Sequence, residues 1–376
     1  MQPSDRSSHG SNDDHFHRPQ PVDAVDAQRE KFQSREIATV LSHYDLGVIT
    51  NIREYRRGSR RSPKLKLETE RGEYLLKRKN SGHTVARAQA GHALQGRASA
   101  AGVPVAELVP LRSGGTLLAL GDRLYEVYEW VQGGRYERDP AQAFEAGVAL
   151  ARLHRAFALL DGEHEHAAAE LPRGGFSDTD AVRRSLFLAD ASASVRVDTE
   201  GRAAIGGFVA SLDTHLARVE KKLGEKGLAG QHPAVCHGDY HPGNTMWSGV
   251  RLVAVIDFDS ARHESVAAEV ANAMLQFSLK HRVGENPDAW QIGLDTDRLR
   301  SFCAGYCSEP AVVPRGELAP LLPWLMMSAV IAEAAAPIAR DGDFAGIPAV
   351  PFLRATSRLV DWISDRTRAI STVFAT

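Results

Sequence analysis

Three polar residues near the middle of the chain have the types and spacing that phosphoryl transfer requires. They lie between Ala234 and Ala261, in the sequence AVCHGDYHPGNTMWSGVRLVAVIDFDSA. Asp239 and Asn244 are five residues apart around a Pro-Gly turn, so a carboxylate can face an acceptor hydroxyl while an amide oxygen binds a metal ion. The segments TMW and RLVAVIDF predict a hairpin that brings Asp257 back beside this loop. Mg²⁺ prefers hard oxygen ligands, which Asn244 and Asp257 supply.

The same stretch contains a second spacing with chemical meaning. His237-x-Asp239-x-His241 is typical of transition-metal ligands, and on an extended segment the three side chains share one face. A metal-dependent hydrolase built on these residues is therefore an alternative hypothesis. Asp259, two positions after Asp257, predicts a second carboxylate near the metal of the phosphoryl-transfer site.

Composition and charge argue against several classes of protein. The chain has 376 residues with 45 Lys and Arg against 47 Asp and Glu, and a net charge of −2 does not favour a nucleic-acid binder. The polar N-terminus lacks the apolar stretch of a signal peptide or membrane anchor. The most apolar run, Leu318 to Ile338, is interrupted by three prolines and a glutamate, which predicts a buried helix. Three cysteines in so long a chain favour a reducing compartment, so we expect a cytoplasmic protein.

The first part of the chain is predicted to be rich in strands. Residues 1–32 are mostly Ser, Asp, His, Pro and Gln and are predicted to be a disordered tail. The runs ITNIREY, PKLKLETE and GEYLLKRK predict an antiparallel meander, and TLLAL with LYEVYEWV predicts a hairpin. Between them Val85 to Ala101, followed by Gly102 and Pro104, predicts one helix. Residues 33–131 therefore form the predicted, strand-rich N-terminal lobe.

Helices are predicted for most of residues 132–376, the C-terminal lobe. The segment AQAFEAGVALARLHRAF and the segment from Ala203 to Leu223 have the apolar spacing of amphipathic helices. Residues 161–175, rich in Gly, His and Glu, are predicted to be a loop. The predicted fold class is thus α+β, with a strand-rich lobe followed by a mainly helical lobe.

The motif pair HGDYHPGN and IDFD resembles the catalytic loop and metal-binding segment of the protein-kinase-like fold. It resembles the superfamily of aminoglycoside phosphotransferases, choline kinases and homoserine kinases more than protein kinases, which carry Arg in the first motif and Gly after Asp-Phe. The resemblance covers residues 33 to 310. It implies a two-lobed fold and ATP-dependent phosphorylation of a hydroxyl, with ATP and Mg²⁺ as cofactors. Asp239 is then the catalytic residue, and Asn244 and Asp257 hold the metal.

The resemblance also implies nucleotide-binding residues in the first lobe. Lys77, at the end of EYLLK, corresponds to the lysine that meets the α- and β-phosphates. The turn RRGS resembles the segment over the nucleotide, where backbone N–H groups at Gly58 and Ser59 approach the phosphates. YEVYEWVQG resembles the hinge, in which backbone atoms of Glu129 and Val131 bind the adenine edge.

The chain departs from the kinase pattern at one position. In kinases the strand lysine pairs with a glutamate on the following helix, but ARAQAGHALQGRASAAG contains no acidic residue. Gln89 or His92 would have to take its place, and His92 is predicted as a partner of Lys77. The missing acid leaves open a further alternative, a nucleotide-binding regulatory module that has lost turnover. Glu269 lies where the family often places an acid that braces the catalytic loop, and the same role is predicted here.

The predicted substrate is a small metabolite with a hydroxyl group, such as a homoserine-like amino acid or an amino alcohol. An aminoglycoside site would favour a strongly acidic cleft, whereas acidic and basic residues are mixed throughout the second lobe. Neither a nucleic acid nor a membrane is expected as a partner.

Overall fold

The computed structural model describes residues 30–56, 58, 61–160, 162–225, 227, 234–281 and 286–375. Of the predicted disordered tail, residues 1–29 lie outside the described residues. Residues 30–32 are in contact with the fold, because Phe32 packs against the core of the sheet and Glu30 pairs with Arg78 at 2.7 Å. The tail prediction is therefore wrong for these three residues.

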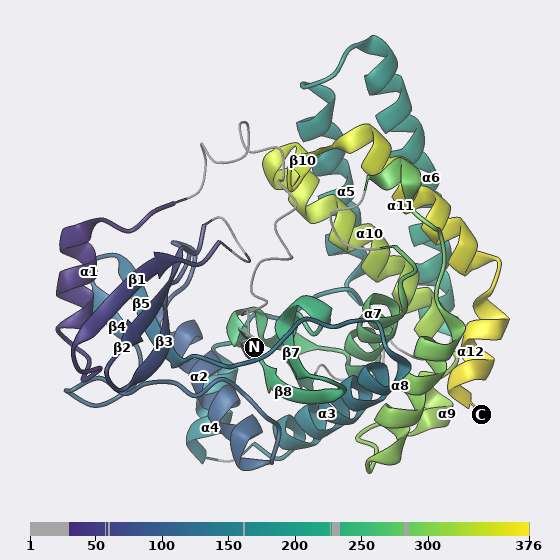
Figure 1. Ribbon diagram of the computed structural model, residues 1–376. Helices are drawn as coiled ribbons and strands as arrows, with labels where there is room; N and C mark the ends of the chain where they lie inside the picture. The colour runs from purple at the N-terminus through teal and green to yellow at the C-terminus, as the bar shows by residue number, and fades with distance from the viewer. Residues whose placement is uncertain are drawn as a thin grey trace, which may run out of the picture.

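A five-stranded antiparallel sheet is the centre of the first lobe (Figure 1). In sheet order its strands are β1 (Ile49–Glu54), β2 (Lys64–Thr69), β3 (Gly72–Arg78), β5 (Arg123–Glu129) and β4 (Leu118–Leu120). The predicted meander and hairpin are both confirmed. Alternation along KLKLET sends Leu65 and Leu67 into a core that also contains Leu76 and Val127.

Two helices belong to this lobe, α1 (Ser34–Leu41) and α2 (Val85–Ala100), and α2 is the helix that the sequence predicts. Small residues let α2 approach the second lobe closely. A Cβ on Gly91 would stand 3.2 Å from the carbonyl oxygen of Phe258. The helix therefore lies beside the segment that carries Asp257.

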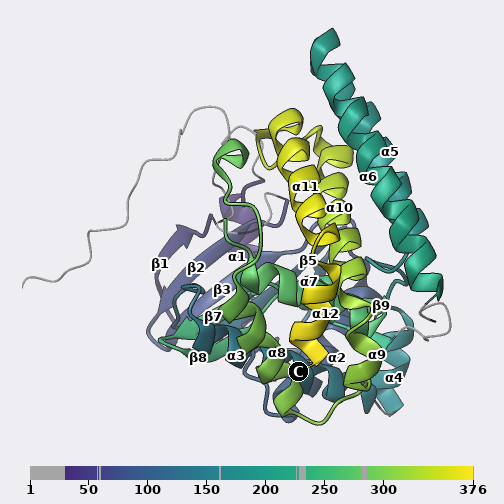
Figure 2. The same ribbon diagram turned by 90° about the vertical axis from the view of Figure 1, so that its right-hand side faces the viewer.

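The second lobe is mainly helical, and its pair α5 and α6 projects beyond the rest of the molecule (Figure 2). Its helices are α3 (Pro140–Ala158), α4 (Gly162–Ala169), α5 (Thr179–Ser194), α6 (Thr199–Glu225), α7 (Val266–Ser278), α8 (Thr296–Ser308), α9 (Arg315–Leu318), α10 (Leu322–Asp341), α11 (Ala349–Ser364) and α12 (Thr367–Ala375). The loop predicted for residues 161–175 is wrong where α4 forms. The Ala and Glu residues of GEHEHAAA are good helix formers, and they outweigh the Gly and His that suggested a loop.

Helices α3 and α8 pack against each other through glycines. A Cβ on Gly147 would stand 2.2 Å from the Phe302 carbonyl oxygen, and one on Gly305 would stand 2.0 Å from the Phe144 carbonyl oxygen. The two backbones are therefore closer than any side chain at these positions allows. This close packing fixes α3, which carries His154, against α8.

The motif residues lie on short elements between α6 and α7. Strand β6 (Ala234–Cys236) pairs with β9 (Arg262–Glu264), and β7 (Thr245–Ser248) pairs with β8 (Arg251–Val255). The 3₁₀ turns η3 (Pro242–Asn244) and η4 (Phe258–Ser260) complete the region. The predicted hairpin that returns Asp257 toward Asn244 is therefore confirmed.

Helix α10 is the one helix in the described part of the chain that is long and apolar enough to cross a membrane. Of its apolar window, 67% is buried inside the protein, where it packs against α5, α7 and α11. The run from Leu318 to Ile338 thus supplies a core helix, as the sequence predicts.

The three cysteines are all free thiols and differ in exposure. Cys236, at the end of β6, and Cys303, on α8, are buried, whereas Cys307, one turn later on α8, is half-buried. Burial raises the pKa of Cys236 well above its ordinary value.

Candidate active site

The loop between β6 and β7 holds Asp239. The Asn244 side chain donates from Nδ2 to the carboxylate Oδ2 and to the main-chain oxygen of Asp239, both at 2.9 Å. His241 Nε2 lies 3.5 Å from the other carboxylate oxygen. Burial raises the pKa of Asp239, but the contacts with His241 and Asn244 outweigh it and the pKa lies below its ordinary value. The group is therefore an ionised carboxylate that can accept the hydrogen of a hydroxyl.

Glu269 on α7 holds the backbone of this loop. Its carboxylate accepts the Gly238 N–H at 2.6 Å and the His237 N–H at 3.2 Å, and His154 Nε2 lies 2.8 Å from it. Burial raises the pKa of Glu269, but the contact with His154 and the neighbouring donors lower it to about 2. The predicted bracing of the catalytic loop by Glu269 is confirmed.

His237 is a structural part of the loop. Its Nδ1 accepts the Asp239 N–H at 3.3 Å, and its Nε2 donates to the Ile256 carbonyl oxygen at 3.2 Å. Burial lowers the pKa of His237, which keeps the ring neutral as this hydrogen-bond pattern requires. Both ring nitrogens are therefore occupied, and the metal-ligand set predicted for His237, Asp239 and His241 is not formed.

Another group of possible metal ligands lies behind the loop. Ligand atoms of His154, Cys236 and Glu269 are within 4.8 Å of one another, and all three residues are buried. Hydrogen bonds already use both nitrogens of His154, because Nε2 contacts Glu269 and Nδ1 lies 2.9 Å from the Tyr306 hydroxyl. The group is thus a hydrogen-bonded support of the loop.

Asp257 and Asp259 meet Lys77 of β3 at the boundary between the lobes. Lys77 Nζ lies 3.0 Å from Asp257 Oδ1 and 2.7 Å from Asp259 Oδ2. Asp257 has the left-handed backbone angles φ 67° and ψ 63°, which residues other than glycine adopt rarely and mainly at functional sites. The lysine predicted to bind phosphates thus lies beside the carboxylate predicted to bind the metal.

A third carboxylate near Lys77 is Glu126 on β5. Glu126 is fully buried, stands opposite Lys77 in the register of β3 and β5, and places Oε1 3.3 Å from Nζ. His92, the predicted partner of Lys77, instead has Nε2 2.7 Å from Glu126 Oε2 and Nδ1 2.8 Å from the Thr116 hydroxyl. The predicted contact between His92 and Lys77 is therefore wrong, because both ring nitrogens have other partners.

Asn244 and Asp257 carry oxygen atoms that fit Mg²⁺. Asn244 uses Nδ2 for its bonds to Asp239, which leaves Oδ1 as a ligand atom, and its main-chain oxygen accepts the Ile256 N–H at 3.0 Å. Asp257 directly follows Ile256 in the chain, and its side chain is 37% exposed. A neutral amide oxygen and a carboxylate, completed by phosphate oxygens, form a typical Mg²⁺ site. These two residues would hold the ion, which would neutralise charge on the phosphates.

The other predicted nucleotide-binding residues lie at the edge of the first lobe. Gly58 has a left-handed φ of 78°, and a Cβ there would stand 2.9 Å from Lys64 Nζ. Ser59 lies outside the described residues. The Glu129 N–H already donates to the Glu107 carbonyl oxygen at 2.8 Å, so its carbonyl is the group left for a ligand. For Val131, no backbone hydrogen bond is formed with any described residue.

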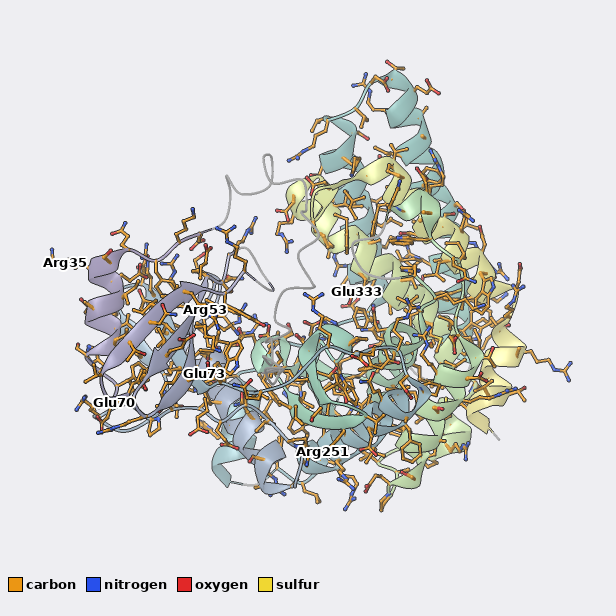
Figure 3. All side chains as sticks on the ribbon, viewed as in Figure 1. Arg35, Arg53, Glu70, Glu73, Arg251 and Glu333 are labelled. Carbon is orange, nitrogen blue, oxygen red and sulfur yellow. The ribbon has the colours of Figure 1, made fainter. Side chains whose placement is uncertain are left out.

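One acidic residue of α10 interacts electrostatically with Asp239. Glu333 is half-buried and is seen on the part of the helical lobe that lies toward the sheet (Figure 3). Burial and the charge of Asp239 raise the pKa of Glu333 to about 7, although His241 and Arg262 lower it. Sequence reasoning missed this residue, and its one signal is a glutamate within an apolar run.

Comparison with known families finds a match to the phosphotransferase enzyme family over residues 52–313. This range includes Lys77, Glu126, Asp239, Asn244 and Asp257. No curated protein sequence is significantly similar to the chain.

Several solved structures share the fold. An aminopropanol kinase associated with a microcompartment has a TM-score of 0.64 at 17% identity, covering 89% of this chain and 98% of that chain. Amicoumacin kinase in complex with AMP-PNP, Ca²⁺ and its ligand has a TM-score of 0.62 at 13% identity, covering 90% and 94%. The ethanolamine kinase of Plasmodium vivax has a TM-score of 0.57 at 11% identity, covering 85% and 84%. These similarities establish the predicted two-lobed, protein-kinase-like fold.

Proposed function

The chain belongs to the phosphotransferase enzyme family, and from this premise we propose that it transfers the γ-phosphoryl group of ATP, with Mg²⁺, to a hydroxyl of a small molecule that carries an amine. The observation that carries the proposal is the geometry at the lobe boundary. Lys77 Nζ lies 3.0 Å from Asp257 Oδ1. The Asn244 side chain donates to Asp239, and its main-chain oxygen accepts the N–H of Ile256, the residue before Asp257. One region thus offers a cation for phosphates, oxygen ligands for a metal and a carboxylate for the acceptor.

In this mechanism Asp239 orients the acceptor hydroxyl and accepts its proton as the oxygen attacks phosphorus. The Asn244 amide and the bracing of Gly238 by Glu269 keep the carboxylate in place, so that little reorganisation is needed during the reaction. Lys77 exchanges its contacts with Asp257 and Asp259 for the phosphate oxygens. When bound, Mg²⁺ supplies charge neutralisation on those phosphates.

The two alternative functions have less support. The hydrolase requires His237 as a ligand, and its ring nitrogens are hydrogen bonded to backbone groups. The regulatory module rests on the absence of an acid on α2, whereas Glu126 supplies a buried acid beside Lys77 from β5. The geometry therefore favours an active phosphotransferase.

Glu333 supports an amine on the acceptor. Within the residues that the structure describes, no hydrogen bond or ion pair engages its carboxylate, although it lies near the negative charge of Asp239. A substrate ammonium group placed between these two acids would relieve their repulsion. The named activities of two structural relatives, an aminopropanol kinase and an ethanolamine kinase, agree with this class of acceptor.

The function is tested by following ADP formation from ATP and Mg²⁺ with a panel of acceptors. The panel pairs each amino alcohol and hydroxy amino acid with a diol of the same size, so that only the amine differs. We expect turnover with at least one amine-bearing member and a much higher KM for its diol partner. Turnover of diols and amino alcohols with equal KM would contradict the role of the amine.

A pH series on Glu333→Gln tests how the amine is recognised. Below about pH 7 Glu333 is protonated and cannot balance an ammonium group, so in the parent the KM for the amine substrate should fall as the pH rises through about 7. Among the described residues, the charges that act on the pKa of Glu333 are those of Asp239 and His241 and of Arg262 and Glu264 of β9. In the variant we expect the KM for the amine substrate to be raised about tenfold at pH 8. We also expect this KM not to change as the pH rises through about 7.

The matched control for that series is Glu317→Gln, which removes an exposed glutamate from α9. Its KM and its pH dependence should equal those of the parent. A KM for Glu333→Gln that equals the parent value throughout would show that the amine is bound elsewhere.

A further inference from the structure

The strand lysine has a buried acidic partner that does not come from the helix. Helix α2 contains no acidic residue, yet Glu126 Oε1 lies 3.3 Å from Lys77 Nζ. Residues directly opposite on neighbouring antiparallel strands hold their side chains close together on the same face of the sheet. The register pairs Lys77 with Glu126, so the sheet itself brings the two charges together.

Glu126 is in turn held by two residues. Its Oε2 lies 2.7 Å from Lys79 Nζ, two residues beyond Lys77, and 2.7 Å from His92 Nε2. His92 is oriented by Thr116 at 2.8 Å. A buried carboxylate is costly unless it is paired and hydrogen bonded. The contacts with Lys79 and His92 meet that need for Oε2, whereas Oε1 has no hydrogen-bond partner among the described residues and is balanced by the charge of Lys77.

Lys79 also pairs with Asp259. The side chain of Lys79 is 1% exposed, and of the two lysines only Lys77 has an ion pair with Asp257 among the described residues. Lys79 is therefore farther from the predicted metal ligand than Lys77 in its pattern of contacts. If Lys77 turns toward phosphates, Asp259 loses one cation but keeps Lys79. The second lysine thus prevents two acids from being left unpaired when the first changes partners.

We propose that Glu126 is the positioning residue for Lys77, supplied by strand β5 in place of an acid on α2, and that Lys79 and His92 hold Glu126 and Asp259 while Lys77 binds phosphates. This inference rests on the proposed function, since it assigns Lys77 to a nucleotide. It gives a role to a second buried lysine and to His92.

The test moves the acid from the strand to the helix and measures binding of an ATP analogue with Mg²⁺ by calorimetry. Glu126→Gln should weaken binding about tenfold or more, because a buried charge-assisted contact is lost. His92→Glu alone should also weaken binding, because it places a second carboxylate against Glu126. The double variant Glu126→Gln/His92→Glu restores one carboxylate at this place and should recover most of the affinity.

If Glu126 positions Lys77, the effect of His92→Glu on nucleotide affinity should change sign. The substitution should weaken binding in the parent and strengthen binding in Glu126→Gln. Losses that simply add in the double variant, or single variants that bind like the parent, would overturn the inference. Glu70→Gln, in the exposed turn between β2 and β3, is the control and should bind like the parent. If Glu126→Gln does not fold, Glu126→Asp keeps the charge, and its affinity must fall between that of the parent and that of Lys77→Met.

Direct binding separates this inference from the proposed function, because no acceptor is needed. A parent protein that binds no nucleotide overturns the proposed function and this inference with it. A parent that binds, with variants that bind equally well, overturns the inference alone.

Discussion

Asp239→Asn is expected to lower kcat by about 10²–10⁴-fold while leaving the affinity for ATP with Mg²⁺ unchanged. The carboxamide keeps the shape of the side chain and its contact with Asn244 but cannot accept the proton of the acceptor hydroxyl. Asp257→Ala is expected to act on the other step, because it removes a carboxylate that fits the metal and contacts Lys77. Here the part of the nucleotide affinity that depends on Mg²⁺ should disappear.

The two variants are compared by calorimetric titration of ATP with and without Mg²⁺, alongside ADP formation with a saturating acceptor. The separation of roles is the expected result, since Asp239 contacts Asn244 and His241 whereas Asp257 contacts Lys77. Equal loss of nucleotide binding in both variants would show that Asp239 also holds the metal or the nucleotide.

Glu269→Ala is expected to lower the free energy of unfolding by roughly 3–5 kcal/mol, because it leaves buried partners of an ionised carboxylate unpaired. The groups that lose their acceptor are His154 Nε2 and the N–H groups of His237 and Gly238. The loop that carries Asp239 would lose its support as well, so kcat should fall in the fraction that remains folded. Urea denaturation monitored by tryptophan fluorescence measures the change.

The pH dependence of the same interaction has a definite sign. The pKa of Glu269 lies at about 2 in the folded protein, below its ordinary value of 4.5. Its contribution to stability is therefore complete above about pH 4.5 and is lost as the pH falls from there toward 2. Glu269→Gln should show a weaker loss of stability over that range than the parent, and Glu317→Ala should follow the parent. A parent-like urea midpoint for Glu269→Ala would refute the bracing role.

Local patterns allowed the central part of the site to be predicted. Asp239 and Asn244 are held by one short turn, and Asp257 is returned by one hairpin, so their relation depends on about twenty consecutive residues. Lys77 could be assigned only through the family resemblance, because its partner Asp257 is 180 residues away. The strands of the first lobe were also predictable, since their alternation and turns are local properties.

Glu126 and Glu333 could not be identified in the same way. Pairing Glu126 with Lys77 requires the register of two strands separated by a helix, and nothing local specifies that register. The sequence therefore predicts that His92 contacts Lys77, whereas in the structure His92 contacts Glu126. Glu333 is one charge in an apolar helix, and its neighbour Asp239 becomes known only when α10 is packed against the rest of the lobe. Both residues depend on long-range packing.

The exposure of the cysteines gives the protein internal reporters of motion near the catalytic loop. Cys307 is half-buried and should react first with an alkylating reagent, whereas Cys236 is fully buried at the end of β6, directly before His237. Alkylation of Cys236 thus requires a local opening that uncovers the end of β6, and its rate reports the frequency of that opening. A ligand that binds across this loop would slow the labelling of Cys236 and leave that of Cys307 unchanged, so mass spectrometry of the two peptides could detect ligand binding without turnover.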